Sequence, residues 1–197
     1  VPLAITAISG EKLDQLQGSD SQDLGGLAPN VTVLCGAVSN SAAVISIRGI
    51  TNPAAETFGL DTANGLYVDG IYIARSGATG LDVTEIERVE VLRGPQGTLF
   101  GRNTTGGAIA FISRQPKDEF GVKAEVGYGN FGALNGKVSL DTGEIGGAVK
   151  ATVSYSHRQR DGFVDNILEP DDSKDPGSRE SDSFRAAIRV EPTDSGY

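Results

Sequence analysis

Two patterns of hydrophobic and polar residues divide the chain near its middle. Up to residue 117, short apolar runs alternate with segments that contain glycine or proline, which is typical of a compact α+β unit. After this point, apolar and polar residues alternate one by one over longer stretches, which predicts strands with one apolar and one polar face. We therefore predict two domains, residues 1–117 and 118–197, with the boundary within residues 115–120.

The first pattern predicts a small mixed sheet with little helix. Ser9 can cap a helix over residues 11–16, a second short helix is expected from Asp20 to the residue before Pro29, and a helical turn over residues 82–86. Asp69-Gly70 suits a two-residue hairpin turn, because both residues tolerate positive φ angles. We expect strands at residues 4–8, 31–34, 44–47, 66–68, 71–73 and 88–92.

The second pattern predicts strands within residues 122–129, 134–140, 149–156 and 184–190. Such strands suit either the wall of a transmembrane β-barrel or an antiparallel sheet with one face in water. The connection between Leu140 and Ala148 is short and glycine-rich, whereas the one between Asp161 and Asp182 is long and acidic. Short turns on one side and long loops on the other are typical of outer-membrane barrels, and four strands are too few to close one.

Composition and charge exclude several classes of protein. No apolar run among the 197 residues approaches the roughly 18 residues of a membrane-spanning helix. The net charge of −9 opposes nucleic-acid binding. One cysteine and one histidine cannot supply an internal disulfide, the common metal shells or a redundant Ser-His-Asp triad, so most metal and nucleophile chemistry is disfavoured and no metal or cofactor is expected. Without a methionine or a charged-then-apolar leader, the chain suggests a processed or internal piece of a longer product.

The segment most rich in sequence signals has the sequence ERVEVLRGPQGTLFGRNTTGGAIAFISRQP and covers residues 87–116. Five glycines occur within 14 of these residues, which predicts several turns or close backbone approaches. The spacing fits neither a dinucleotide-binding fingerprint nor a P-loop, so nucleotide binding is disfavoured.

Several motifs, in this order along the chain, resemble the plug domain of TonB-dependent outer-membrane receptors. Val1-Pro2 with the strand and helix that follow resembles the start of a plug, and Ile47-Arg48-Gly49 resembles its first Arg-Gly element. Tyr67-Val68-Asp69-Gly70 resembles the plug hairpin, and residues 87–101 with Gly106-Gly107-Ala108-Ile109 resemble the most recognisable stretch of the family. The resemblance implies an α+β plug domain with a small mixed sheet, followed by antiparallel strands of an incomplete transmembrane β-barrel.

The resemblance implies transport, not catalysis. Its members take up a scarce nutrient, such as a ferric siderophore or similar iron complex, across the bacterial outer membrane, with the plug inside the barrel and facing the periplasm. The implied partners are the nutrient, outer-membrane lipid and TonB of the inner-membrane complex, which would grip a segment ahead of Val1 by β-augmentation. The alternatives are a carbohydrate or cobalamin receptor of the same family, or a signalling or binding plug module without transport.

The resemblance also assigns roles to single residues. Arg48 and Arg93 match plug arginines that face glutamates of the inner barrel wall, the alternative being solvated charges at strand ends. Ligand contacts are implied in loops at the outward end of the plug, where ordinary surface residues are the alternative, at Glu56, Phe58, Arg75 and Ser76. Structural turns are expected at Asp69, Gly70, Gly94, Gly97, Gly101, Gly106 and Gly107.

Overall fold

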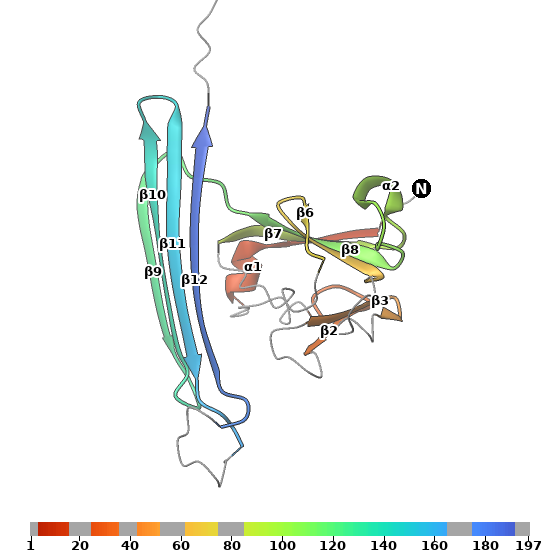
Figure 1. Cartoon of the computed structure of the whole chain (residues 1–197). Coiled ribbons are helices and arrows are strands. Elements are labelled where there is room, and N and C mark those ends of the chain that lie inside the picture. Colours follow the sequence, from red (N-terminus) through yellow and green to blue (C-terminus); the bar gives the residue numbers. More distant parts are fainter. Residues whose placement is uncertain are drawn as a thin grey trace, which may run out of the picture. The chain divides into compact units, whose positions relative to one another are not determined.

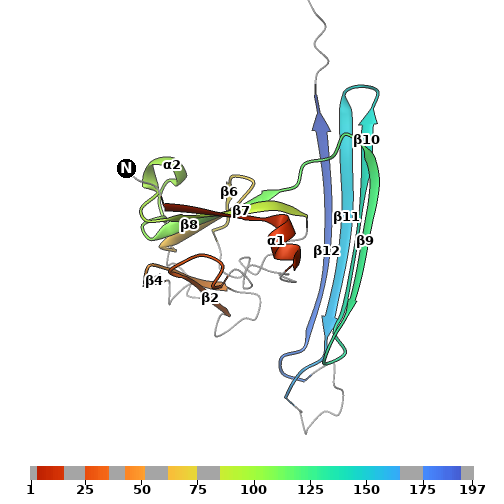
Figure 2. The same cartoon turned by 180° about the vertical axis from the view of Figure 1, so that it is seen from behind.

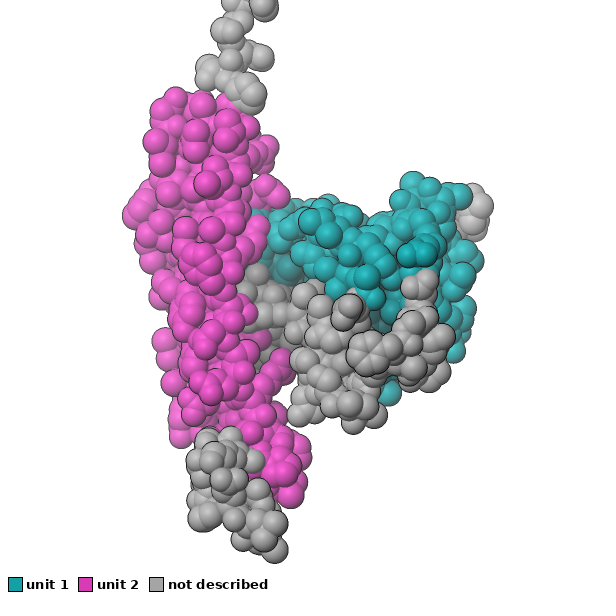
Figure 3. Space-filling view, viewed as in Figure 1, with its two compact units in different colours: residues 1–114 teal, residues 115–197 magenta. Residues whose placement is uncertain are grey.

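The computed structural model describes residues 4–15, 25–35, 43–51, 62–74, 85–164 and 175–191. The chain forms two compact units, Val1–Arg114 and Gln115–Tyr197, which are drawn in teal and magenta in Figure 3. Within the described ranges, no helix is both long and apolar enough to cross a membrane.

A five-stranded mixed sheet is the larger part of the first unit (Figure 1). Its strand order is β1-β7-β8-β5-β6, and β5 runs parallel to β8 while the other neighbours are antiparallel. Its strands are β1 (Ala4–Ser9), β5 (Asn64–Val68), β6 (Ile71–Tyr72), β7 (Ile86–Arg93) and β8 (Gly107–Ser113). The mixed sheet confirms the prediction, but Ile86 begins a strand and does not end a helical turn.

A smaller antiparallel sheet completes the first unit, with the order β2-β3-β4. Its strands are β2 (Val31–Cys35), β3 (Ala43–Ile47) and β4 (Ile50–Thr51). The helix predicted ahead of Pro29 is wrong in its described part, because residues 25–30 form turns. Gly26 has a φ of 85°, which a right-handed helix does not allow. Residues 20–24 of that prediction lie outside the described residues.

The two sheets of the first unit share one hydrophobic core. Helix α1 (Gly10–Gln15) follows β1, and the N–H of Lys12 donates to Ser9 Oγ at 3.3 Å, which confirms the predicted cap. The core residues come from both sheets and from α1, and include Leu13, Val33, Ile45, Ile47, Leu66, Val89, Val91, Ile109 and Phe111. Apolar burial therefore holds the sheets together.

The second unit is one antiparallel sheet with the order β12-β11-β10-β9 (Figure 2). Its strands are β9 (Phe120–Tyr128), β10 (Leu134–Ile145), β11 (Val149–Arg160) and β12 (Arg179–Val190). A strand of 12 residues rises about 40 Å, and at the tilt of about 40° found in barrels it spans the roughly 30 Å of a bilayer core.

Two connections in the second unit differ from the prediction. The connection after Leu140 is shorter than expected, because β10 continues through a bulge between Asp141 and Glu144 and ends at Ile145. The long acidic connection also ends earlier, because β12 already begins at Arg179. Both strands extend through polar residues, which the search for apolar alternation excluded.

The two faces of the second sheet differ sharply. Apolar side chains are exposed on one face: Val126 is 83% exposed and Ile188 73%. Neighbouring strands place apolar side chains side by side on this face, since Leu140 pairs with Val122 on one side and with Val153 on the other. Serine and threonine side chains of the opposite face, such as Ser139 and Thr152, are buried. An apolar face of this size suits lipid and not water, as in the wall of an incomplete transmembrane barrel.

Candidate functional site: two arginines beside a glycine-rich loop

Arg48 lies in the tight turn between β3 and β4. Arg48 and Gly49 have φ angles of 52° and 79°, which place both residues in the left-handed region. This conformation costs a non-glycine residue about 1–2 kcal/mol, so the surrounding structure must hold the turn in place. The N–H of Arg48 donates to the carbonyl of Asn30 at 2.9 Å, while the residue as a whole is exposed. The turn thus fixes the backbone and leaves the guanidinium available.

Arg93 ends β7 and is only partly exposed. Its Nη1 donates to the carbonyl of Pro29 at 3.2 Å, and its Nη2 donates to Thr6 Oγ1 at 3.3 Å. Its Nε is buried and has no partner among the described residues. Each of these acceptors is neutral, so the positive charge of Arg93 is held in position but is not neutralised by them.

The fold brings Arg48 and Arg93 together although 44 residues separate them in the sequence. Nη1 of Arg48 lies 3.4 Å from the position that a Cβ on Gly94 would occupy, and Gly94 is the neighbour of Arg93. Both arginines also contact the same turn, at Pro29 and Asn30. Within the described residues neither guanidinium forms an ion pair. Two cations held close together without an acid form a site for an anionic partner.

The glycine-rich segment after Arg93 forms a loop whose two ends lie side by side. The N–H of Gly94 donates to the carbonyl of Gly106 at 2.9 Å, and that of Gln96 donates to the carbonyl of Thr104 at 3.0 Å. Helix α2 (Gly97–Phe100) forms the far end of the loop. Gly97 differs from Gly94, Gly101 and Gly106 of this loop, because it begins α2 without a positive φ and a Cβ there would meet nothing within 4 Å. Neither a turn nor a close approach requires glycine at that position.

Aromatic side chains hold this loop against the five-stranded sheet. The ring of Tyr67 on β5 lies 4.7 Å from that of Phe100 and 5.5 Å from that of Tyr72. Burial, and to a smaller extent Tyr72, raise the pKa of Tyr67, so its hydroxyl stays protonated and donates to the carbonyl of Phe100 at 2.7 Å. Asn103 donates to the hydroxyl of Tyr72 at 3.0 Å. The hairpin turn next to these strands has φ angles of 49° at Asp69 and 83° at Gly70.

The residues expected to contact a ligand, Glu56, Phe58, Arg75 and Ser76, lie outside the described residues. Asn64, which the sequence did not single out, proves to be a buried polar residue at the start of β5. The dipeptide Asn64-Gly65 predicts a turn, so the usual signal of this pair is misleading here. A useful signal would have been an amide side chain two residues ahead of the apolar run at residues 66–68.

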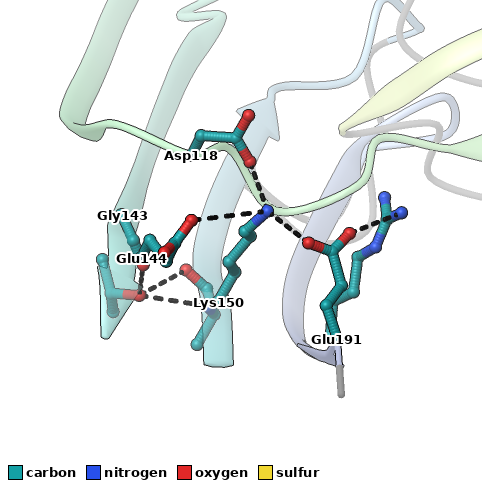
Figure 4. A network of polar contacts seen from close by, with 8 residues as sticks. Asp118, Gly143, Glu144, Lys150 and Glu191 are labelled. Atoms are coloured by element: carbon teal, nitrogen blue, oxygen red, sulfur yellow. Dashed lines mark hydrogen bonds and ion pairs between the residues drawn. The ribbon is translucent and has the colours of Figure 1, made fainter. Parts of the chain in front are cut away.

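A second charged cluster lies at one end of the second sheet (Figure 4). Nζ of Lys150 lies 2.6 Å from Asp118 Oδ1, 2.7 Å from Glu191 Oε2 and 4.0 Å from Glu144 Oε2, and the lysine side chain is only 8% exposed. The hydrogen bonds from Lys150 lower the pKa of Asp118 and of Glu191. Arg189 Nη2 also lies 2.7 Å from Oε1 of Glu191. The cluster connects the segment before β9 to the ends of β11 and β12.

The described residues contain no group of three histidine, cysteine or acidic side chains that would hold a metal ion. His157 Nδ1 lies 2.8 Å from Asp182 Oδ1, which also accepts a hydrogen bond from the hydroxyl of Tyr155 at 2.6 Å. This places His157 in a polar group near the end of β11. The chemistry that the arginine site offers is electrostatic binding of an anion.

Comparison with protein families gives a match that covers more than half of the chain. The model of the TonB-dependent Receptor Plug Domain matches residues 1–108. Among curated relatives, the catecholate siderophore receptor Fiu of Escherichia coli (strain K12) is 37% identical over 93 residues, which are 47% of this chain and 12% of the relative. The pesticin receptor of Yersinia enterocolitica is 28% identical over 193 residues, 96% of this chain and 27% of the relative.

A solved structure resembles both units. The crystal structure of the ferric yersiniabactin uptake receptor FyuA from Yersinia pestis superposes with a TM-score of 0.86 at 26% sequence identity. The match covers 98% of this chain and 29% of that receptor. The chain thus spans less than a third of the length of these relatives.

Proposed function

The chain belongs to the family of the TonB-dependent receptor plug domain, and from this premise we propose that it serves TonB-dependent uptake of an iron–siderophore complex. It is located in the outer membrane, like the receptors that it resembles. The members of this family are transport receptors, and we propose that this chain has no enzyme activity. The partners of the complete receptor are TonB, the siderophore complex and outer-membrane lipid, with no nucleic acid.

The succession of two different units in one chain carries this proposal. The first unit buries its apolar residues, as a domain inside a water-filled lumen must. The second unit follows directly and exposes apolar residues along strands long enough to cross a bilayer. A plug followed by barrel strands is the arrangement of large outer-membrane transporters with a closed lumen.

The names of the relatives support the iron–siderophore class. Fiu is named as a catecholate siderophore receptor and FyuA as a ferric yersiniabactin uptake receptor. We propose that Glu56, Phe58, Arg75 and Ser76 contact the siderophore. Arg75 would meet an anionic oxygen of the ligand and Phe58 would offer an apolar surface.

Arg48 and Arg93 have a different role in this proposal. They hold the plug in the barrel by pairing with carboxylates of the barrel wall. Two neighbouring arginines that form no ion pair with any described residue support this role, because such a pair gains an acid partner when the plug is seated. Glycine and turn residues of the loop after Arg93 keep the two side chains adjacent.

Uptake in cells tests the function. The receptor, expressed from its complete reading frame in a bacterium that lacks siderophore receptors of its own, is expected to import ⁵⁵Fe bound to catecholate or related siderophores, and to lose this import when TonB is deleted. Import of cobalamin or a carbohydrate alone would overturn the substrate class. Binding without import would favour a signalling or binding module.

A variant tests the ligand contact. Arg75→Ala is expected to weaken siderophore binding about tenfold, as the loss of one charge-assisted hydrogen bond does. Arg88→Ala is the matched control, because the Arg88 side chain is 42% exposed and its guanidinium is paired with Glu87 and Glu90. Equal binding by both variants would remove Arg75 from the ligand site.

A further inference from the structure

The side-chain amide of Asn64 links the two sheets of the plug. Asn64 is the first residue of β5 in the five-stranded sheet and is only 4% exposed. Its Nδ2 donates to the carbonyl of Ile45 on β3 at 2.9 Å and to the carbonyl of Ile50 on β4 at 2.8 Å. One buried side chain therefore bonds to both strands of the β3–β4 hairpin, whose position beside the larger sheet is visible in Figures 1 and 2.

The two hydrogen bonds and the glycine at position 106 both suit an asparagine at position 64. Only an amide supplies two donors from one nitrogen at this short reach. Its Oδ1 is buried, has no hydrogen-bond partner among the described residues, and leaves no room for a Cβ on Gly106. The same Cβ would lie 2.9 Å from Cγ2 of Ile50. Glycine at position 106 thus allows Asn64 and the hairpin to approach the larger sheet.

The contacts of Asn64 continue to the arginine site. Ile45 precedes Arg48 by three residues and Ile50 follows it by two, so the two bonded carbonyls lie on either side of the Arg48-Gly49 turn. On the other side, the carbonyl of Gly106 accepts the N–H of Gly94, beside which Arg48 lies. The position of the hairpin on the larger sheet therefore sets the position of Arg48 relative to Arg93.

We propose that Asn64 is a positioning residue for Arg48: its amide docks the β3–β4 hairpin on the five-stranded sheet and holds Arg48 beside Arg93. This inference rests on the proposed function, in which the two arginines together meet carboxylates of the barrel wall. Asn64 touches neither the partner nor the ligand, and acts only through the turn that carries Arg48.

Hydrogen exchange of the full receptor tests the docking. Asn64→Asp keeps the shape of the side chain but removes both donated hydrogen bonds, and the control Asn103→Asp removes a hydrogen bond to Tyr72 without touching the hairpin. We expect exchange of a peptide covering residues 43–51 to become at least about tenfold faster in Asn64→Asp, with β8 and the control receptor unchanged. Unchanged exchange in residues 43–51, or equal acceleration in all peptides, would overturn the docking role.

A double-mutant cycle tests whether Asn64 acts through Arg48. Asn64→Asp and Arg48→Ala are each expected to lower siderophore uptake about tenfold, and the double variant is expected to be no more than about twofold worse than Arg48→Ala. Losses that multiply would overturn the inference, because a purely structural asparagine would add its effect to that of Arg48. Asn64→Ser, which keeps one donor, is measured in parallel and takes the place of the Asp variant if the latter does not assemble.

The two measurements separate this inference from the proposed function. An Arg48→Ala receptor with normal uptake would overturn the role of Arg48 in holding the plug. Hydrogen exchange would still decide whether Asn64 docks the hairpin, since that measurement does not depend on transport.

Discussion

The two units use similar residues in opposite ways. Ile47 of the first unit is completely buried, whereas Ile188 of the second, with the same side chain, is 73% exposed. The polar residues are reversed as well: Arg48 is exposed in the first unit, while Thr152 and Lys150 are buried in the second. Alternation along a strand thus shows that a sheet has two different faces. Which kind of side chain is buried shows the medium of the exposed face: buried apolar residues indicate that the sheet faces water, and buried polar residues indicate that it faces lipid.

The largest expected effect comes from breaking the apolar core of the first unit. Phe111 is 1% exposed, and Phe111→Ala is expected to destabilise the plug by about 3–5 kcal/mol, because it removes apolar burial and leaves a cavity. The exposed Leu99 of the same unit is the control, and Leu99→Ala is expected to cost about 0.5 kcal/mol or less. The opening free energy of β8 amides, measured by hydrogen exchange, checks both values. Equal losses would contradict the assignment of this core.

A charge on the apolar face of the second unit is expected to have the next largest effect. Leu140 lies in the middle of the apolar rows, and Leu140→Arg is expected to cost about 2–4 kcal/mol in lipid. Gln159 lies on the same face but near a strand end, where Gln159→Arg is expected to cost about 0–1 kcal/mol. Reversible unfolding of the receptor in lipid vesicles measures both. A cost that does not depend on position would argue that this face does not meet lipid.

A smaller effect is expected where β10 approaches the start of β9 in the second unit. Gly143 has a φ of 70°, and a Cβ there would lie 2.8 Å from the backbone nitrogen of Phe120. Gly143→Ala is therefore expected to cost about 1–3 kcal/mol, because backbone cannot yield as a flexible side chain can. At Gly136 of the same strand a Cβ meets nothing within 4 Å, so Gly136→Ala is expected to be neutral or slightly stabilising. The same unfolding measurement in vesicles distinguishes them, and similar values for both would contradict the close approach at Gly143.

The smallest effect concerns pH. Lys150 lowers the pKa of Asp118 and of Glu191 below their ordinary values of 3.8 and 4.5. Because these pKa values are lower in the folded state, the cluster stabilises the second unit above the ordinary values, and this contribution is lost as the pH falls through the folded-state values. Stability should therefore fall below about pH 4.5 in the native receptor and fall less in Lys150→Met. Unfolding between pH 3 and pH 7 checks this, and equal pH dependence in both receptors would contradict it.

In the second unit, the sequence predicted the strands far better than the links between them. Alternation located the four strands of the second sheet, but it assigned the residues after Leu140 to the connection that ends at Ala148. There the hydroxyl of Thr142 accepts the N–H of Ala151 at 3.0 Å, and a bulge keeps the strand paired. A hydrogen bond between two strands has no signature in either strand alone, so the extra length of β10 could not be predicted.

The candidate site was predicted in part. Arg48 and Arg93 were named from their resemblance to a known family, and their roles remain predictions. That they meet at Gly94 follows from the pairing of distant strands, which local pattern does not contain. Asn64 was missed for a related reason: its local signal, the pair Asn64-Gly65, indicates a turn, and only the buried carbonyls of Ile45 and Ile50 explain an amide at this place.

The outer strands of the four-stranded sheet have a consequence for the order of assembly. Within the described residues, β9 and β12 each have a neighbouring strand on one side only. The other side carries backbone N–H and C=O groups that hydrocarbon cannot satisfy, each at a cost of several kcal/mol. The apolar face alone therefore cannot bring this sheet into the bilayer. Both edge strands, β9 and β12, must therefore gain hydrogen-bonded partners before the sheet enters the bilayer. Until then the sheet must be shielded from water and from other chains.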